Sequence, residues 1–81
     1  MKITVRTFSK IKEICGFEER EFIVSEGISI SNVMKELHKC YKGLNSYQDE
    51  FLFAINENYC DMNSQLNEND ILAIFPPVSG G

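Results

Sequence analysis

Residues 71–81 read Ile-Leu-Ala-Ile-Phe-Pro-Pro-Val-Ser-Gly-Gly. The first five are apolar and include types with high strand propensity, so they predict a β-strand over residues 71–75. Pro76 and Pro77 end this strand because proline has no N–H to donate to a sheet. The stretch therefore predicts a strand that continues directly into an extended tail, residues 76–81.

The predicted tail combines a stiff base with a thin tip. Two prolines favour an extended backbone, whereas Gly80 and Gly81 have no side chain to block entry into a narrow pocket. A stretch of this length reaches at most about 20 Å, enough to bring the Gly81 carboxylate into a partner's active site. That group has a pKa of about 3.5, so it is an anion that needs activation, for example as an acyl adenylate, before a nucleophile attacks it.

The first strand is predicted over residues 2–8 by alternation of apolar and polar side chains, with Ile3 and Val5 facing the core. Phe8 shares the parity of the outward-facing residues, which makes this aromatic side chain a candidate contact residue. Further strands are predicted at residues 21–24 and 51–55.

A hairpin is predicted where the apolar run 51–55 meets the turn-like Asn56-Glu57-Asn58 and a short piece around Tyr59 and Cys60. Residues 65–70 predict a second turn, which leads into the last strand.

Two helices are predicted between the strands. Ser9 is expected to cap a short helix over Lys10 to Cys15, with Gly16 as its stop. Ser29 is the expected N-cap of the main helix, and Gly43 the expected end. The main helix carries an apolar stripe at the three-and-four spacing of one helix face, formed by Ile30, Val33, Met34, Leu37 and Tyr41.

The predicted elements follow no regular strand-helix alternation. The fold class is therefore α+β, with a mixed sheet packed on one main helix. Residues 1–75 form one globular domain in this interpretation, and residues 76–81 form the tail.

Charge and composition exclude several classes of function. A net charge of −4 disfavours nucleic acid, and no apolar run predicts a membrane span or a secretory signal. Cys15, Cys40 and Cys60 are an odd, widely spaced set that argues against a disulfide framework and suits the cytoplasm. We expect these thiols to be buried or half-buried.

Residues 1–75 carry no phosphate loop, CxxC pair or nucleophile beside a histidine. His38 has no ligand partner at metal-site spacing, so it is expected on a solvated helix face and no metal is predicted. Glu18 and Glu19 are expected to be solvated charges.

Residues 66–81 resemble the closing pattern of the ubiquitin-like β-grasp sulfur carriers, most closely the small subunits of molybdopterin synthase. That pattern is a turn, an acidic residue, a strand ending in an aromatic, and Pro-Pro-Val-Ser/Thr-Gly-Gly. Upstream, Ala54-Ile55-Asn56 is similar to the family's Ala-Val-Asn, and Phe8-Ser9-x-x-x-Glu13 to its first strand-to-helix junction. Asn69 departs from the family's usual glycine but tolerates the left-handed conformation of such a turn.

The resemblance implies a ubiquitin-like β-grasp fold and a cycle of sulfur transfer. An E1-like adenylyltransferase would adenylate Gly81 with ATP, and a sulfur donor protein would convert it to a thiocarboxylate. The carrier would then insert its tail into the large subunit of molybdopterin synthase, in a heterotetramer of two small and two large subunits. There it would give sulfur to cyclic pyranopterin monophosphate, as a non-catalytic subunit with no bound cofactor.

The resemblance also places partner contacts. Phe8, Tyr59 and Phe75 correspond in position to apolar contact residues of the family, with Pro76, Pro77 and Val78 continuing along the tail. Three alternative functions stay open: a sulfur carrier for thiazole or another product, a ubiquitin-like protein modifier, and a binding module whose Gly-Gly is inert. The sequence assigns no role to the three cysteines.

Overall fold

The computed structural model describes residues 1–46 and 51–76. Its strands form one five-stranded sheet in the order β2-β1-β5-β3-β4. Strands β1 and β5 pair in parallel, whereas the other neighbours are antiparallel. The elements are β1 (Lys2–Thr7), α1 (Ser9–Cys15), β2 (Glu19–Ile23), α2 (Ile30–Cys40), the 3-10 helix η1 (Lys42–Ser46), β3 (Leu52–Ile55), β4 (Asn58–Cys60) and β5 (Ile71–Phe75).

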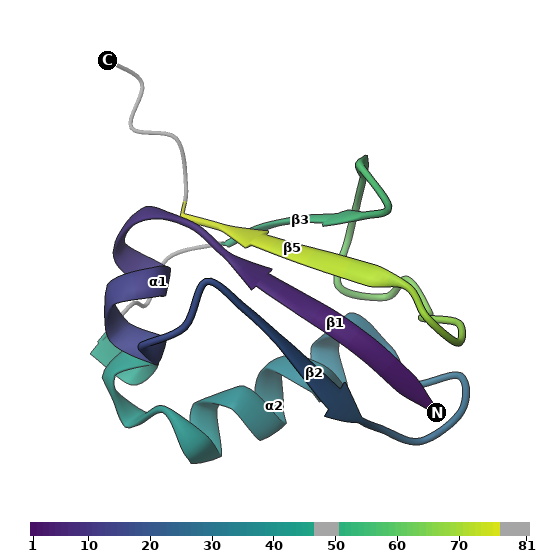
Figure 1. The fold of residues 1–81 in the computed structure, drawn as a ribbon, viewed down its shortest axis with the longest axis horizontal. Helices are drawn as coiled ribbons and strands as arrows, with labels where there is room; N and C mark the ends of the chain where they lie inside the picture. Colours follow the sequence, from purple (N-terminus) through teal and green to yellow (C-terminus); the bar gives the residue numbers. More distant parts are fainter. Residues whose placement is uncertain (47–50, 77–81) are drawn as a thin grey trace.

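Helix α2 crosses one face of the sheet, and α1 lies at the end toward which β1 and β5 both point (Figure 1). The inner face of the sheet and the apolar stripe of α2 form the core. This arrangement confirms the predicted α+β fold, in which a mixed sheet packs on one main helix. Fully buried core side chains include Ile3, Val5, Ile11, Ile30, Leu44, Leu66, Leu72 and Ile74.

Helix α2 begins as predicted, because the Ser29 hydroxyl accepts a hydrogen bond from the Asn32 N–H at 3.2 Å. The expectation that Gly43 ends it is wrong. The helix ends at Cys40, and the Tyr41 N–H donates to the Leu37 carbonyl at 2.7 Å. Gly43 serves a packing role instead, since a Cβ there would lie 2.8 Å from Cγ2 of Ile14.

The prediction that Ser9 caps α1 is wrong. The helix starts at Ser9, and Phe8 holds the N-cap position in an extended conformation with no side-chain cap. The Ile11 N–H donates to the Phe8 carbonyl at 3.1 Å, so the first turn closes on Phe8. Gly16 ends α1 as predicted, in the left-handed conformation at φ 78°.

Strand boundaries shift by one or two residues. Strand β1 ends at Thr7, whose buried hydroxyl donates to the Phe17 carbonyl, so Phe8 lies just outside the strand. Strand β2 covers Glu19–Ile23 instead of residues 21–24.

The turns contain residues in the left-handed backbone conformation. Asn56 and Glu57 take positive φ values of 48° and 72° in the hairpin between β3 and β4. Asn69 adopts φ 68°, which confirms its predicted tolerance of the left-handed region.

The cysteines are free and differ in exposure. Cys15 is buried and Cys60 half-buried, as predicted, whereas Cys40 is exposed on α2, so that part of the prediction is wrong. Neither helix of the described ranges is long and apolar enough to cross a membrane.

Candidate docking site at the end of the last strand

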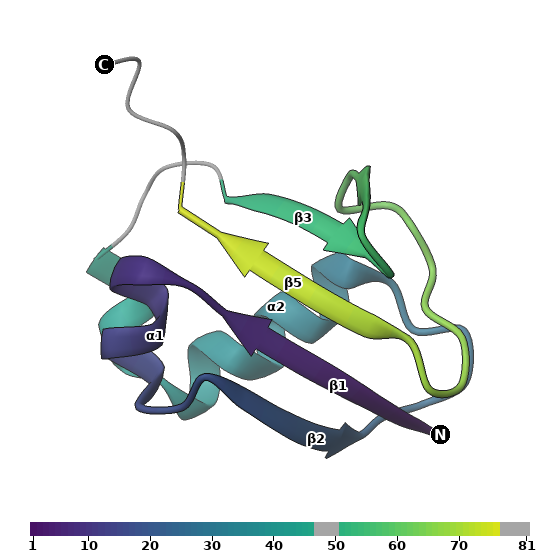
Figure 2. The ribbon, with the colours of Figure 1, turned by 45° about the horizontal axis from the view of Figure 1, so that its top comes forward.

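The carboxyl end of β5 places Phe75 at the point where the strand gives way to Pro76 (Figure 2). Phe75 pairs with Leu52 of β3 in the antiparallel register. Along β5 the buried residues alternate with half-exposed ones, and Phe75 falls on the outer set together with Ile71 and Ala73. Its ring is therefore presented on the face of the sheet opposite α2, as its sequence parity predicts.

Phe8 reaches the same place from β1. The parallel register pairs Thr7 with Ile74, so the residue after Thr7 arrives beside Phe75. The two rings stack with centroids 4.6 Å apart and planes inclined by 14°. Both residues are half-buried, so each ring keeps one part accessible.

Tyr59 completes the cluster from β4. Its strand partner is Ala54, whose other neighbour across the sheet is Ala73. These small side chains leave room above the sheet, and the Tyr59 ring lies 6.1 Å from that of Phe75 while 74% of the residue stays exposed. We call Phe8, Tyr59 and Phe75 the aromatic patch. The structure therefore brings together the three contact residues that the sequence suggested.

Two further apolar side chains extend this surface and were missed in the sequence. Leu52 is 37% exposed and Ile71 is 40% exposed on the outer face. Ile71 shares the parity of Phe75, which is a signal available from sequence. Leu52 has the opposite parity to the buried Phe53, so it too was identifiable once β3 was assigned.

A hydrogen-bond network fixes the start of β5. The Asn56 amide Nδ2 donates to Oδ1 of Asp70 at 2.9 Å, and the Asn56 Oδ1 accepts from the Ile71 N–H at 2.9 Å. Oδ2 of Asp70 accepts from the Asn67 N–H at 2.7 Å. Asp70 is 8% exposed, so these bonds compensate the burial of its carboxylate. The network locks the hairpin to the strand that carries Phe75.

Pro76 is half-buried and follows Phe75 directly. The other predicted tail contacts, Pro77 and Val78, and the predicted reactive residues, Gly80 and Gly81, lie outside the described residues. The described part of the site is thus the aromatic patch, a candidate docking surface next to Pro76.

The described residues offer few side chains that could bind a metal or act as an acid or base. Within residues 1–46 and 51–76, no group of three or more His, Cys, Asp or Glu side chains could hold a metal ion. His38 lies on α2, where its Nδ1 is 2.7 Å from Oδ1 of Asn45. Glu18 and Glu19 are exposed and pair with Lys12 at 3.5 Å and Arg6 at 3.2 Å, as expected for solvated charges. The arrangement is suited to binding a protein surface.

The sequence is similar to proteins of a known family. The ThiS family matches residues 5–81. A molybdopterin synthase sulfur carrier subunit of Chlamydomonas reinhardtii is 30% identical, with 100% of both chains covered. One of Dictyostelium discoideum is 37% identical over 91% of this chain and 90% of that protein.

Two solved structures share the fold of this chain. The putative molybdopterin converting factor subunit 1 from Pyrococcus furiosus superposes with a TM-score of 0.85 at 23% identity, covering 96% of this chain and 99% of that one, which supports the fold. In the complex of subunits 1 and 2 of molybdopterin-converting factor from Helicobacter pylori 26695, the matching chain has a TM-score of 0.69, 26% identity and full coverage of both chains. The chain belongs to the ThiS family.

Proposed function

We propose that this protein is a sulfur carrier in molybdenum cofactor biosynthesis. Gly81 carries the sulfur as a thiocarboxylate, and the sulfur is given to cyclic pyranopterin monophosphate in molybdopterin synthase. The observation that carries the proposal is the aromatic patch at the end of β5, where the chain continues into residues 76–81. Membership of the ThiS family and full-length likeness to molybdopterin synthase sulfur carrier subunits support it.

The proposed chemistry uses the chain as a substrate. An activating adenylyltransferase joins the Gly81 carboxylate to AMP and releases pyrophosphate from ATP, which gives the acyl carbon a good leaving group. A sulfur donor protein delivers sulfur at the sulfide level. This sulfur bonds to the acyl carbon while the bond from that carbon to the phosphate oxygen breaks, so AMP leaves and a thiocarboxylate remains. After the sulfur passes to the pterin precursor, water restores the carboxylate and the carrier is ready for another round. The two sulfurs of the dithiolene then require two charged carriers.

The net charge of this chain indicates which chemical groups its partner supplies. The chain has a net charge of −4, so it repels anionic phosphates. The groups that bind the phosphorylated precursor and transfer protons therefore belong to the large subunit, and this chain is a non-catalytic subunit. The Helicobacter pylori complex of subunits 1 and 2 supports a large-subunit partner, for which we propose an assembly of two small and two large chains.

The aromatic patch provides the binding energy for this insertion. Ordering a glycine-containing tail in a partner's pocket costs about 1–2 kcal/mol per residue, so favourable contacts must form elsewhere. Aromatic side chains are enriched among binding hot spots, whose truncation costs about 2 kcal/mol or more. We therefore assign the patch to both partners in turn, first the adenylyltransferase and then the large subunit.

Intact mass spectrometry tests the proposal. The protein is incubated with ATP, a cognate adenylyltransferase and a sulfur source, beside a matched variant lacking Gly81. The expected result is a mass gain equal to replacement of one oxygen by sulfur in the full chain alone. Addition of the large subunit and cyclic pyranopterin monophosphate is then expected to yield molybdopterin and return the original mass.

Other outcomes separate the alternatives. A charged carrier that supports thiazole formation and no molybdopterin would make it a carrier for another pathway. Isopeptide adducts on lysines would identify a protein modifier. The absence of any change with a competent adenylyltransferase would indicate an inert binding module.

A further inference from the structure

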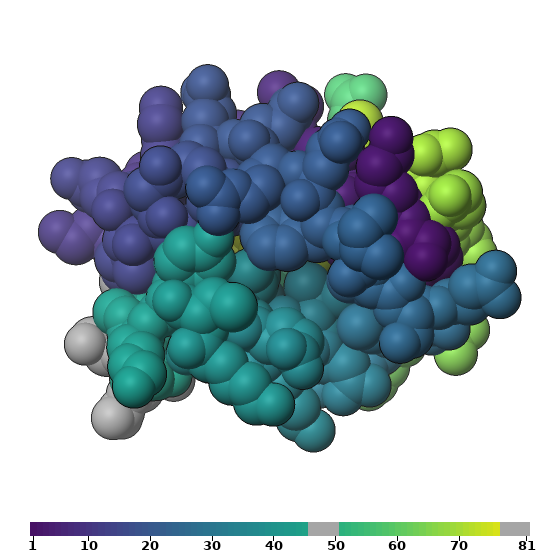
Figure 3. Space-filling model, turned by 60° about the horizontal axis from the view of Figure 1, so that its bottom comes forward, coloured from purple at the N-terminus to yellow at the C-terminus, as the bar shows by residue number. Residues whose placement is uncertain are grey.

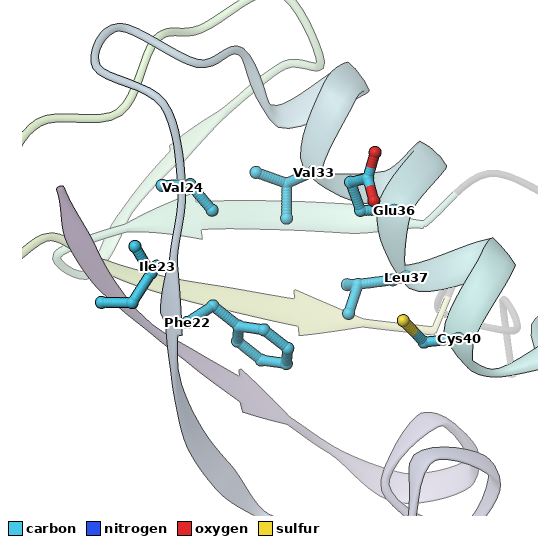
Figure 4. Close-up of a pocket in the computed structure, with 7 residues that line it drawn as sticks. All are labelled: Phe22, Ile23, Val24, Val33, Glu36, Leu37 and Cys40. Carbon is cyan, nitrogen blue, oxygen red and sulfur yellow. The ribbon is translucent and has the colours of Figure 1, made fainter.

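An apolar groove lies between β2 and α2, on the side of the molecule that Figure 3 presents. Phe22, Val33 and Leu37 contribute its apolar lining (Figure 4). Glu36 and Cys40 line it from α2. We call this feature the β2–α2 groove. Since β2 and β4 are the two ends of the strand order, the groove is at the opposite edge of the sheet from Tyr59.

The groove is bordered by an unpaired strand edge. Within the described residues β2 pairs with β1 alone. The Val24 N–H donates to the Met1 carbonyl at 2.8 Å and the Thr7 N–H to the Glu18 carbonyl at 2.9 Å. Backbone groups in an antiparallel pair point alternately toward and away from the partner. The outward-pointing set is therefore Glu19, Glu21 and Ile23.

The side chains of β2 differ on its two faces. On the inner face, Phe22 is half-buried beside α2. On the outer face, Glu21 and Glu19 form exposed ion pairs with Lys2 at 3.5 Å and Arg6 at 3.2 Å. A strand added outside β2 would therefore meet the carboxylates of Glu19 and Glu21 on one face. On the other face it would meet Phe22 and, beside the groove, the Arg20 guanidinium, which donates to the Tyr41 hydroxyl at 2.7 Å.

We propose that the β2–α2 groove binds an extended segment of another protein, which adds a strand to β2. The backbone of the segment bonds to the outward-pointing groups of Glu19, Glu21 and Ile23. Its inward side chains are apolar and enter the groove, and its outward side chains opposite Glu19 and Glu21 are basic. Ile23 is 81% exposed, so the outward residue opposite it is apolar.

A second copy of this chain fits the groove poorly. Antiparallel pairing of two β2 strands about their middle residue sets Glu21 against Glu21 and Glu19 against Ile23. Like charges directly opposite one another destabilise a sheet pair. In this register the charge pattern of the edge therefore favours a basic strand over its own copy.

This surface is separate from the aromatic patch. The groove lies at the β2 edge, whereas Phe8 and Phe75 stack over the end of β1 and β5 and Tyr59 lies on the β4 edge. The segment therefore binds whether or not a partner occupies the patch. The inference does not depend on sulfur transfer.

The test uses a capped peptide, Ile-Val-Lys-Val-Lys, added to the isotope-labelled full chain and followed by backbone amide chemical shifts. We expect shifts at Glu19, Glu21, Ile23 and Glu36. Methylation of the third peptide nitrogen removes a donor aimed at β2 and is expected to weaken binding about tenfold or more. Methylation of the second nitrogen, which points away from β2, is the matched control and leaves binding within about twofold.

Two protein variants complete the test. E21K is expected to reverse the preference at the central position, so that it binds the peptide Ile-Val-Glu-Val-Lys, whose glutamate faces residue 21, more tightly than the basic peptide. E26K, in the turn after β2, adds the same charge change away from the strand and keeps the preference for the basic peptide. Equal effects of the two methylations, shifts outside the groove, or concentration-dependent shifts at Glu21 without peptide would overturn the proposal.

Discussion

The ring of Phe8 lies flat on the ring of Phe75, with centroids 4.6 Å apart. One residue follows the first strand and the other ends the last strand, and the parallel pairing of β1 with β5 brings them together. The contact therefore fixes the entry of α1 against the position from which residues 76–81 continue.

Removal of both rings should reveal coupling between them. We expect the loss of stability in the double variant to be smaller than the sum of the two single losses by about 0.5–1.5 kcal/mol, the coupling energy of a stacked pair. The measurement is a double-mutant cycle of F8A, F75A and the double variant by urea unfolding. Strict additivity of the two single losses would contradict the stacking contribution.

Loss of Phe75 should also weaken partner binding. Truncation of an aromatic hot spot costs about 2 kcal/mol or more, so we expect F75A to bind the large synthase subunit at least about thirtyfold less tightly in calorimetric titration. E26A, in the exposed turn after β2, is the surface control and should bind as the original protein does. Unchanged affinity of a folded F75A protein would remove Phe75 from the docking site.

The Asn56–Asp70 network predicts a stability effect. N56A removes a donor to the buried Asp70 carboxylate and an acceptor for the Ile71 N–H. We expect the free energy of unfolding to fall by about 1–3 kcal/mol. Asn58 donates to the Asn56 carbonyl at 3.3 Å from an exposed position, so N58A should lose less than about 0.5 kcal/mol in the same urea titration. Equal losses would show that the network does not hold the hairpin to β5.

Gly43 should be intolerant of a side chain for steric reasons. Its added Cβ would lie 2.8 Å from Cγ2 of Ile14, so we expect G43A to lose about 1–3 kcal/mol of stability. In an I14A background, which lacks the Cγ2 methyl, the G43A change should cost less stability than it does in the original protein.

G16A is the control, because Gly16 has φ 78° and open space around its Cβ position. The I14A change should leave the loss caused by G16A unaltered.

Burial raises the pKa of the Cys15 thiol above its ordinary value of 9.0, against a smaller opposing effect of the Arg20 charge. The folded state therefore holds this proton more tightly than the unfolded state. Its contribution to stability is complete below the ordinary pKa and is lost as pH rises through the folded-state pKa.

The free energy of unfolding should accordingly fall more steeply in the original protein than in C15A as the pH rises above the ordinary thiol pKa of 9.0. C15A loses packing at every pH, so the difference in pH dependence is the informative quantity. A C15A slope equal to that of the original protein would show that Cys15 does not carry this effect.

Local patterns predicted much of the fold. Period-two alternation identified the inner residues Ile3 and Val5, and helical spacing identified the buried stripe of α2. The cap positions were less predictable, because several residues near a helix end can compete. Phe8 takes the N-cap position instead of Ser9, in an extended conformation that also lets its ring stack on Phe75.

The candidate sites needed information that no local pattern contains. Sequence parity showed that Phe8 and Phe75 face outward, yet their contact depends on pairing between the first and last strands. Likewise, the β2–α2 groove depends on which strand is left at the edge of the sheet, and this is set by the topology.

The parallel pairing of β1 with β5 also has a consequence during protein synthesis. Strand β1 leaves the ribosome well before its partner β5, because α1, β2, α2, β3 and β4 lie between them in the chain. The sheet therefore cannot close until residue 75 has left the exit tunnel, and the contacts of high sequence separation form late. A chain that stops before β5 lacks the Phe8–Phe75 stack, so a partner that requires this stack would not bind such a chain.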